Sequence, residues 1–180
     1  MLTQIINRCQ DIASKIEFPY QFAQHKLDKE LGQEILDMSP MSTQFELNHE
    51  RVSLLVSKSG HYGRVHKDGI ATHISFNYPI KILDDKCITS WFSDEDMKDY
   101  QTDDNPPGQT GRRLIGCDTS KHCPLKTMCA KPNEAVLFNT EIWHDFDNRQ
   151  SANERIILTL RPLHPENIYF EDARKIMFGF

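Results

Sequence analysis

Apolar residues recur at every third or fourth position near the start of the chain, between residues 3 and 16. This spacing is typical of an amphipathic helix, and Pro19 is expected to end it. A second, more polar helix is predicted over about residues 21–36, although Gly32 inside it disfavours a helix. The pattern therefore indicates a helical N-terminal part, residues 1–40.

From Phe45 onward the pattern changes to short runs of β-branched and aromatic residues, separated by Gly, Asp, Asn and Pro. Such runs are typical of strands. The clearest strand candidates are residues 51–56, 70–80, 87–92, 135–140 and 155–160. Because no helix separates each strand from the next, the pattern favours an antiparallel sandwich or barrel over a parallel sheet with crossover helices.

The segments between these strands carry weaker signals. Ser93 precedes three acidic residues and is expected to cap a helical turn within residues 93–100. Residues 101–133 are predicted to form a long polar loop that could act as a lid. A last helix is expected at about residues 166–178, after Pro165. We therefore expect one domain over residues 1–180, with its β-rich core at about residues 45–162.

Composition narrows the class of protein. The chain has 180 residues, of which 38% are hydrophobic and 26% charged, so it should bury a core and fold without disulfides. A net charge of -5 does not favour binding to nucleic acid. No window is apolar for long enough to span a membrane, and the N-terminus does not resemble a secretory signal. We therefore expect a cytoplasmic protein with no membrane attachment and no obligate protein partner.

The five cysteines are odd in number and widely spread, which indicates reduced thiols rather than a disulfide framework. Cys117, Cys123 and Cys129, with His122 among them, leave open a structural zinc site. Their five-residue gaps do not match the usual two-to-four-residue spacing of zinc ligands. We therefore favour thiols in a loop.

A candidate metal site comes from His66 and Asp68, followed far downstream by Trp143-His144. In an extended segment, side chains two residues apart project to the same side, so His66 and Asp68 can reach one point. We expect a strand ending near His144 to lie beside the one ending near Asp68. Two imidazoles and one carboxylate on one face of an ion suit non-haem Fe(II) that also binds a co-substrate and dioxygen.

A buried arginine would suit the distal carboxylate of such a co-substrate, because it can donate two parallel hydrogen bonds. Arg155 follows His144 by eleven residues, on a strongly β-patterned run. Arg161 has the same parity, so alternation does not choose between them, and only the distance from His144 favours Arg155. Ser75 and Asn77 share one strand face and are weaker candidates for lining the same cavity. For both, a purely structural role remains open.

Taken together, the His-x-Asp pair, the distal histidine and the later arginine resemble the Fe(II)/2-oxoglutarate-dependent dioxygenases over about residues 45–162. Residues 74–80 also resemble small bacterial and phage members, some related to aspartyl/asparaginyl β-hydroxylases. The resemblance implies a mainly β fold, a double-stranded β-helix or cupin-like jelly roll with flanking N- and C-terminal helices. It also implies His66, Asp68 and His144 as iron ligands and catalytic residues, with Arg155 as the 2-oxoglutarate anchor.

The same resemblance implies the reaction. Dioxygen would oxidise a substrate, with hydroxylation as the default outcome, while 2-oxoglutarate loses carbon dioxide and becomes succinate. The expected substrate is an amino acid, a peptide side chain or another small metabolite. Two alternatives remain open: a metal-dependent cupin enzyme that is not an oxygenase, and a noncatalytic β-sandwich binding module.

Overall fold

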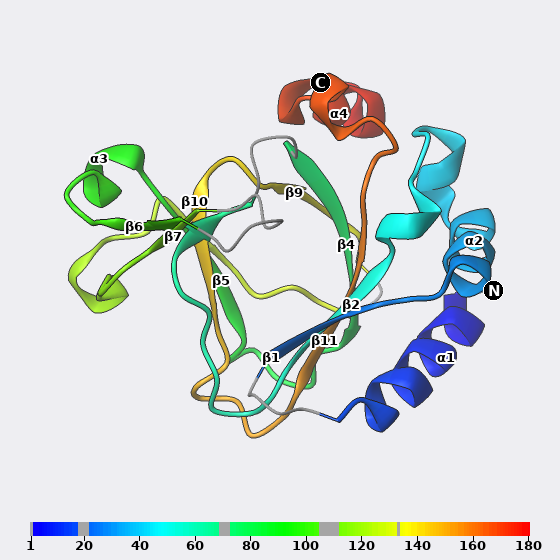
Figure 1. Cartoon of the computed structure of the whole chain (residues 1–180), viewed down its shortest axis with the longest axis horizontal. Coiled ribbons are helices and arrows are strands. Elements are labelled where there is room, and N and C mark those ends of the chain that lie inside the picture. The colour runs from blue at the N-terminus through cyan, green and yellow to red at the C-terminus, as the bar shows by residue number, and fades with distance from the viewer. Residues whose placement is uncertain (1, 18–21, 69–72, 105–111, 133) are drawn as a thin grey trace.

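The computed structural model describes residues 2–17, 22–68, 73–104, 112–132 and 134–180, and these form two antiparallel sheets that face each other (Figure 1). In spatial order, the five-stranded sheet contains β1 (Phe22–Lys26), β2 (Ser53–Ser57), β11 (Arg155–Leu160), β4 (Ile74–Lys81) and β9 (Val136–Asn139). The six-stranded sheet contains β6 (Thr102–Asp104), β7 (Arg112–Leu114), β3 (His66–Lys67), β10 (Trp143–Asp147), β5 (Ile88–Phe92) and β8 (Lys126–Met128). This is the mainly β jelly roll expected from the sequence.

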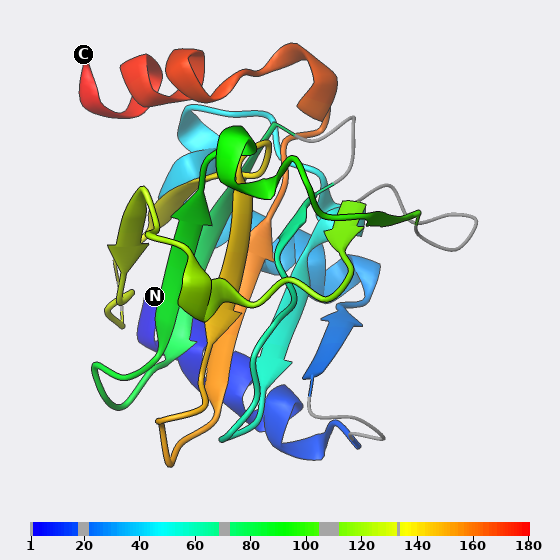
Figure 2. The same cartoon turned by 90° about the vertical axis from the view of Figure 1, so that its left-hand side faces the viewer.

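Helices flank the two sheets. Two of them, α1 (Leu2–Lys15) and α2 (Lys29–Met38), cover the outer face of the five-stranded sheet, whereas α4 (Phe170–Phe178) lies across one end of the sandwich (Figures 1 and 2). The short α3 (Asp94–Met97) precedes β6. In the described part of the chain, 3-10 turns occur at Pro40–Thr43, His49–Arg51, Thr119–Lys121 and Pro165–Asn167. No helix among the described residues is long and apolar enough to cross a membrane.

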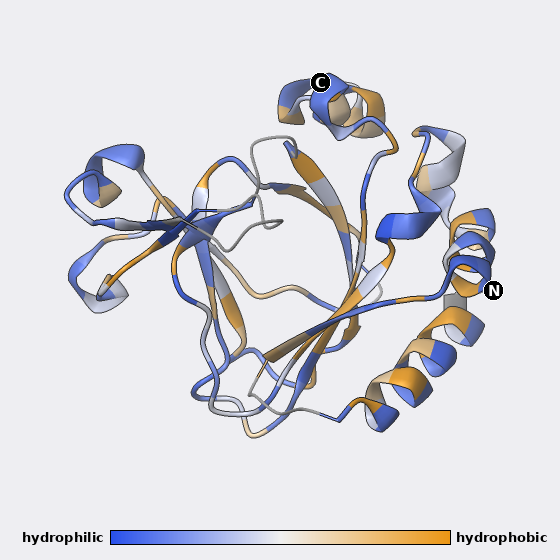
Figure 3. Cartoon of the chain, in the orientation of Figure 1, coloured by the Kyte–Doolittle hydropathy of each residue, from blue (hydrophilic) through white to orange (hydrophobic). Residues whose placement is uncertain are grey.

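The largest hydrophobic core lies between α1, α2 and the outer face of the five-stranded sheet. Apolar and polar residues alternate at the start of β4, whereas the apolar residues of β11 run on from Ile156 to Leu158. Figure 3 shows hydrophobic residues on these strands and on the helices that cover them. Leu54, Leu158 and Phe76 are among the outward residues that pack against the helices. Burial of this face holds the sheet and the helices together. The inner face of the same sheet does not contact these helices and carries a different kind of residue.

The inner face of the five-stranded sheet is unusually polar. Ser53, Ser57 and Thr159 alternate with the apolar core residues and are buried, each at most 3% exposed. Arg155 shares this face and reaches across to Thr89 of β5 in the opposite sheet, which shows that the face lines the space between the sheets. Hydroxyl groups and a cation therefore lie between the two sheets. Without a polar partner, such buried groups are less stable there than apolar side chains would be.

One sequence prediction at the N-terminus is wrong in part. The helix expected over residues 21–36 begins only at Lys29, where the Asp28 side chain accepts a hydrogen bond from the Leu31 backbone N–H. Residues 22–26 form the edge strand β1 instead, paired along its whole length with β2. The stabilisation of β1 comes from pairing with residues far away in the sequence, so the local polar pattern does not reveal this strand. The helix at 3–16, the Ser93 cap and the C-terminal helix are confirmed within a few residues.

The segment 101–133 is also more ordered than expected. It contributes β6, β7 and β8, which extend the six-stranded sheet at both of its edges, while residues 105–111 and 133 lie outside the described residues. The lid function therefore stays a prediction. Of the strand expected at 70–80, residues 70–72 also lie outside the described residues, and β4 starts at Ile74. His144 stands at the start of β10, not at the end of a strand as predicted.

Candidate metal centre

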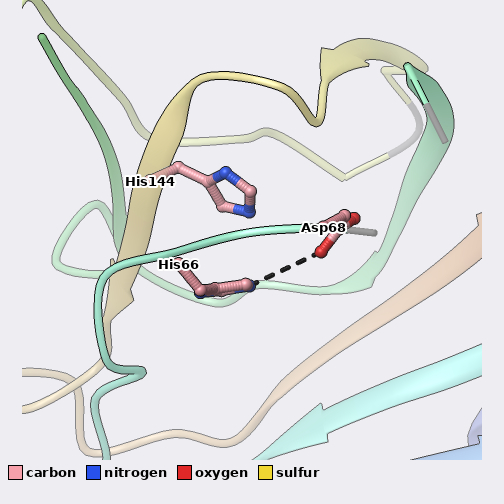
Figure 4. A group of neighbouring side chains, drawn as sticks. All are labelled: His66, Asp68 and His144. Carbon is pink, nitrogen blue, oxygen red and sulfur yellow. Dashed lines mark ion pairs between the residues drawn. The ribbon is translucent and has the colours of Figure 1, made fainter. Parts of the chain in front are cut away.

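The structure brings His66 of β3, Asp68 just after β3 and His144 of β10 together (Figure 4). His66 lies directly opposite His144 in the β3–β10 ladder, and their ring centroids are 4.3 Å apart. Asp68 follows β3, and its backbone N–H donates a hydrogen bond of 3.1 Å to the carbonyl of Thr140, just before β10. Two backbone contacts therefore join two distant parts of the sequence and place the three side chains at one point.

Both imidazoles are oriented for metal binding by their own backbone. The Nδ1 atoms of His66 and His144 lie 2.8 Å from the carbonyls of Arg64 and Ile142, two residues earlier in each case. Donation from Nδ1–H to a carbonyl leaves Nε2 with its lone pair free, which is the tautomer a metal ligand needs. The Nε2 atom of His66 faces Oδ1 of Asp68 at 3.6 Å.

The spacing of the three ligand atoms fits one ion after small rotations. All lie within 4.8 Å of one another. Ligands at right angles around an ion, with bonds of about 2.1 Å, are about 3.0 Å apart. Rotations about the side-chain torsions would close the difference without moving the strands. The donor set, two nitrogens and one oxygen on one side, suits an ion that keeps its other positions open.

Arg161 holds the carboxylate of Asp68 from the side away from the cluster. Its Nη2 atom lies 2.7 Å from Oδ2, and its Nη1 atom donates to the Ile74 carbonyl at 3.3 Å. Burial alone would raise the pKa of Asp68, but Arg161, with His144 and His66, lowers it to about 2. Burial, reinforced by His66, lowers the pKa of His144 to about 3. Near pH 7 the cluster therefore combines a carboxylate with a neutral imidazole, the charge states that metal ligation requires.

Arg155 lies deeper between the sheets. Its Nη2 atom donates to Thr89 at 3.1 Å, and its guanidinium lies 5.3 Å from the ring centre of Phe146. Thr89 and Phe146 face each other two pairs below Trp91 and His144, so the guanidinium is about 7 Å further in than the cluster. Arg155 takes part in none of the ion pairs among the described residues, and burial lowers its pKa.

Several buried polar atoms on the inner face that carries Arg155 have no hydrogen-bond partner among the described residues. They are the Oγ of Ser57, the Oδ1 of Asn77, the Oγ1 of Thr159 and the Nε of Arg155 itself. Buried polar groups are almost always paired, so four orphans on one inner wall indicate a place for a polar ligand or water. Ser75 lies on the same strand face as Asn77, opposite Phe138 of β9.

Aromatic rings shield one side of the cluster. Phe138 meets the His144 ring edge-on, with centroids 4.8 Å apart, and Trp91 packs on Phe138 at 5.2 Å. On another side, His73 stacks on Tyr169 at 4.4 Å and faces Glu141 at 2.8 Å. Sequence reasoning missed the contact of Arg161 with Asp68, and the partnership of Thr89 with Arg155. Neither has a local signal, because each joins strands far apart in the chain.

The zinc alternative finds no support in the described residues. Among them, His66, Asp68 and His144 form the only group with metal-ligand geometry. Cys117 contacts Met97, the Cys129 thiol points to the carbonyl of Asp84, and His122 bonds to Tyr100. All five cysteines are free, as the sequence indicates.

Comparison with known proteins identifies the fold and no closer relationship. No family model matches the chain, and no curated protein matches it. Among solved structures, the epimerase SnoN, determined with Fe3+, alpha ketoglutarate and nogalamycin RO, aligns with a TM-score of 0.55 and 10% identity, over 88% of this chain and 72% of SnoN. A cupin superfamily protein from Desulfitobacterium hafniense aligns with a TM-score of 0.38 and 11% identity, over 84% of this chain and 86% of that protein. Oxalate decarboxylase from Lactobacillus farciminis aligns with a TM-score of 0.40 and 10% identity, over 86% of this chain and 31% of the decarboxylase. The likeness to SnoN supports the jelly-roll fold.

Proposed function

We propose that this chain is an Fe(II)- and 2-oxoglutarate-dependent oxygenase. The observation that carries the proposal is the buried guanidinium of Arg155, which lies below the His66, Asp68 and His144 cluster without a carboxylate partner among the described residues. A buried cation is costly unless an anion accompanies it. A five-carbon diacid that reaches from the cluster to Arg155 would supply that anion.

The residues present fit both groups. His66, Asp68 and His144 would hold the ion through Nε2, Oδ1 and Nε2, leaving its other face open. Arg155 would bind the distal carboxylate of 2-oxoglutarate, with Thr89 fixing the plane of the guanidinium. Asn77 and Thr159, whose side-chain oxygens are buried and unpaired, would line the path between the two sites. Ser75 and Arg161 contribute to the walls, and Arg161 acts through Asp68 rather than as the anchor.

When bound, the iron supplies the oxidising chemistry with dioxygen. The protein's own contribution is orientation and exclusion of water. Arg161 keeps the Asp68 carboxylate ionised and aimed at the ion, while the backbone carbonyls of Arg64 and Ile142 keep each Nδ1 protonated. The Phe138 and Trp91 rings cover the cluster on one side, which limits the access of water to the reacting carbon.

SnoN supports the pairing of iron with a keto diacid on this fold, since it was solved with both. It is described as an epimerase, so it does not favour hydroxylation over other outcomes. We infer hydroxylation as the default, acting on an amino acid, a peptide side chain or another small metabolite in the cytoplasm. The acidic net charge of -5 disfavours nucleic acid as the substrate.

Anaerobic titration with Fe(II) and then 2-oxoglutarate tests this function. The expected result is a metal-to-ligand charge-transfer band with the wild-type chain and none with Asp68→Ala. Arg155→Gln should keep its affinity for Fe(II) but bind 2-oxoglutarate roughly tenfold to a hundredfold more weakly, because a charge-assisted contact is lost. Arg155→Lys should recover part of that loss.

Succinate release in air, measured across a panel of amino acids and peptides, then identifies the coupled substrate. Binding of Fe(II) without any response to 2-oxoglutarate would refute the oxygenase and favour a cupin of another activity. Failure to bind Fe(II) at all would favour a noncatalytic binding module.

A further inference from the structure

One row of paired residues crosses the six-stranded sheet at the level of the metal cluster. From β7 to β8 it contains Arg113, His66, His144, Trp91 and Lys126, each the direct partner of the next. Residues directly opposite in antiparallel strands project from the same face of the sheet. The cationic side chains of Arg113 and Lys126 therefore project from the same face of the sheet as the two imidazoles, one on either side of them.

The neighbours of the two cations support this assignment of faces. Leu114, next to Arg113, is buried with Val65 and Phe92 in a cluster on the outer side of the sheet, so Arg113 must point inward. Met128, two residues after Lys126, packs with Ile157 between the sheets, which places Lys126 on the inner face as well.

Positively charged residues flank the cluster although the chain as a whole is acidic. Acidic groups beside the cluster are already engaged, Asp68 with Arg161 and Glu141 with His73. Arg113 and Lys126 are exposed, and neither takes part in an ion pair within the described segments. Asp103 lies opposite Arg113 in β6 but is not in ion-pair contact with it. The rim beside the metal ligands thus carries unpaired positive charge on a protein whose net charge is -5.

We propose that Arg113 and Lys126 bind an oxyanion of the substrate, a carboxylate or a phosphate, while the substrate's reacting carbon faces the ion. The inference deepens the proposed function and rests on it. Arg113 is one strand from His66, about 5 Å away, and Lys126 is two strands from His144, roughly 10 Å away. Trp91 lies between Lys126 and His144 and offers the substrate an apolar surface. The substrate class is therefore a small anionic molecule.

Matched pairs of probes test the proposal by calorimetric titration of the chain loaded with Zn(II) and saturating 2-oxoglutarate. One set compares N-acetyl amino acids with their primary amides, and the other compares O-phosphoserine and O-phosphotyrosine with the unmodified amino acids. At least one anionic probe should bind about tenfold more tightly than its neutral partner, and Arg113→Gln and Lys126→Gln should each remove most of that preference. Preference for one set identifies carboxylate or phosphate as the group recognised.

Arg51→Gln removes an exposed arginine on a 3-10 turn away from the sheet row, and should leave the preference unchanged. Arg113→Lys should retain part of it. Equal affinity for charged and neutral probes, or no binding of either at millimolar concentration, overturns the inference. The charge-transfer band separates this outcome from failure of the proposed function, because both Gln variants should still form it with Fe(II) and 2-oxoglutarate.

Discussion

Arg161 illustrates how a residue outside the proposed ligand set prepares a ligand. It bonds the Asp68 oxygen that faces away from the cluster, and it is the strongest influence that lowers the pKa of this carboxyl group. Contacts of this kind fix the orientation and ionisation of a ligand. Arg155 and Arg161 share strand parity, yet Arg161 contacts Asp68 whereas Arg155 contacts Thr89.

Replacement of Arg161 by Gln should weaken Fe(II) binding by about tenfold to a hundredfold, since contacts to a ligand carboxylate commonly have effects of that size. Anaerobic competition with a chelator measures the change. Arg155→Gln is the matched control, because it removes the same charge from the first residue of β11, the strand that Arg161 directly follows, without touching a proposed ligand. Unchanged Fe(II) affinity in Arg161→Gln would show that Asp68 needs no such support, or that it is not a ligand.

Cys9 illustrates burial acting on a single thiol. It lies on the buried face of α1 and is 1% exposed, and burial raises its pKa to about 12. Alkylation of the native chain followed by mass spectrometry should therefore label the exposed Cys123 first and leave Cys9 unmodified until the chain unfolds. Labelling of Cys9 as fast as Cys123 would contradict the packing of α1.

The same shift predicts a pH dependence of stability. A thiol whose folded pKa lies above its unfolded value of 9.0 favours the folded state fully below pH 9, and this contribution is lost as the pH rises toward 12. The free energy of unfolding, measured by urea titration, should therefore decline in this alkaline range. Cys9→Ala should show a smaller decline, and an equal decline in both proteins would exclude Cys9 as a source.

At the scale of elements, the strands with strong local patterns could be predicted, and the short ones could not. The run 155–160 coincides with β11, because five of its six residues are buried and the apolar pattern is continuous. By contrast, β3, β6, β7 and β8 have two or three residues each and are defined by the ladders they join. These short strands form because a partner strand pairs with them, and their own sequences show no pattern that predicts a strand.

Gly32 is an element-scale feature whose meaning changes once the packing is known. The sequence suggests that it weakens a helix, yet it lies within α2 at the contact with the turn His49–Arg51. A Cβ atom at this position would stand 2.5 Å from the carbonyl oxygen of His49. The glycine therefore permits the close approach of α2 to that turn.

Gly32→Ala should lower the free energy of unfolding by about 1–3 kcal/mol, the usual cost of overpacking, although alanine favours an isolated helix by about 1 kcal/mol. Urea denaturation measures the change. Lys29→Ala, at the exposed start of the same helix, serves as the control and should have an effect within about 0.5 kcal/mol. A stabilised Gly32→Ala chain would mean that α2 and the turn do not approach so closely.

At the scale of the whole molecule, sequence reasoning predicted that His66, Asp68 and His144 meet, but not how deep Arg155 lies. The order His66, Asp68, His144, Arg155 along the chain is enough to suggest a shared site. Depth depends on register between strands, and it is the pairing of β10 with β5 that places Thr89 and Arg155 below His144. The polar inner wall was likewise hidden, because its serines and threonines are ordinary in sequence.

Metal binding at the His66, Asp68 and His144 cluster should stabilise the whole fold, because it joins β3 to β10. At a free Zn(II) concentration of 100 times its dissociation constant, the gain is about 2.7 kcal/mol. Thermal unfolding should shift upward by several degrees with Zn(II) and return on adding a chelator. His144→Ala should not respond to Zn(II), and an equal response there would place the ion elsewhere.

Anomalous diffraction from crystals grown anaerobically with Fe(II) and 2-oxoglutarate tests the central claim most directly. The account predicts an iron peak bonded to the Nε2 atoms of His66 and His144 and to a carboxylate oxygen of Asp68. It also predicts the distal carboxylate of 2-oxoglutarate on the guanidinium of Arg155. An iron peak away from these three side chains, or a 2-oxoglutarate molecule that does not contact Arg155, would contradict it.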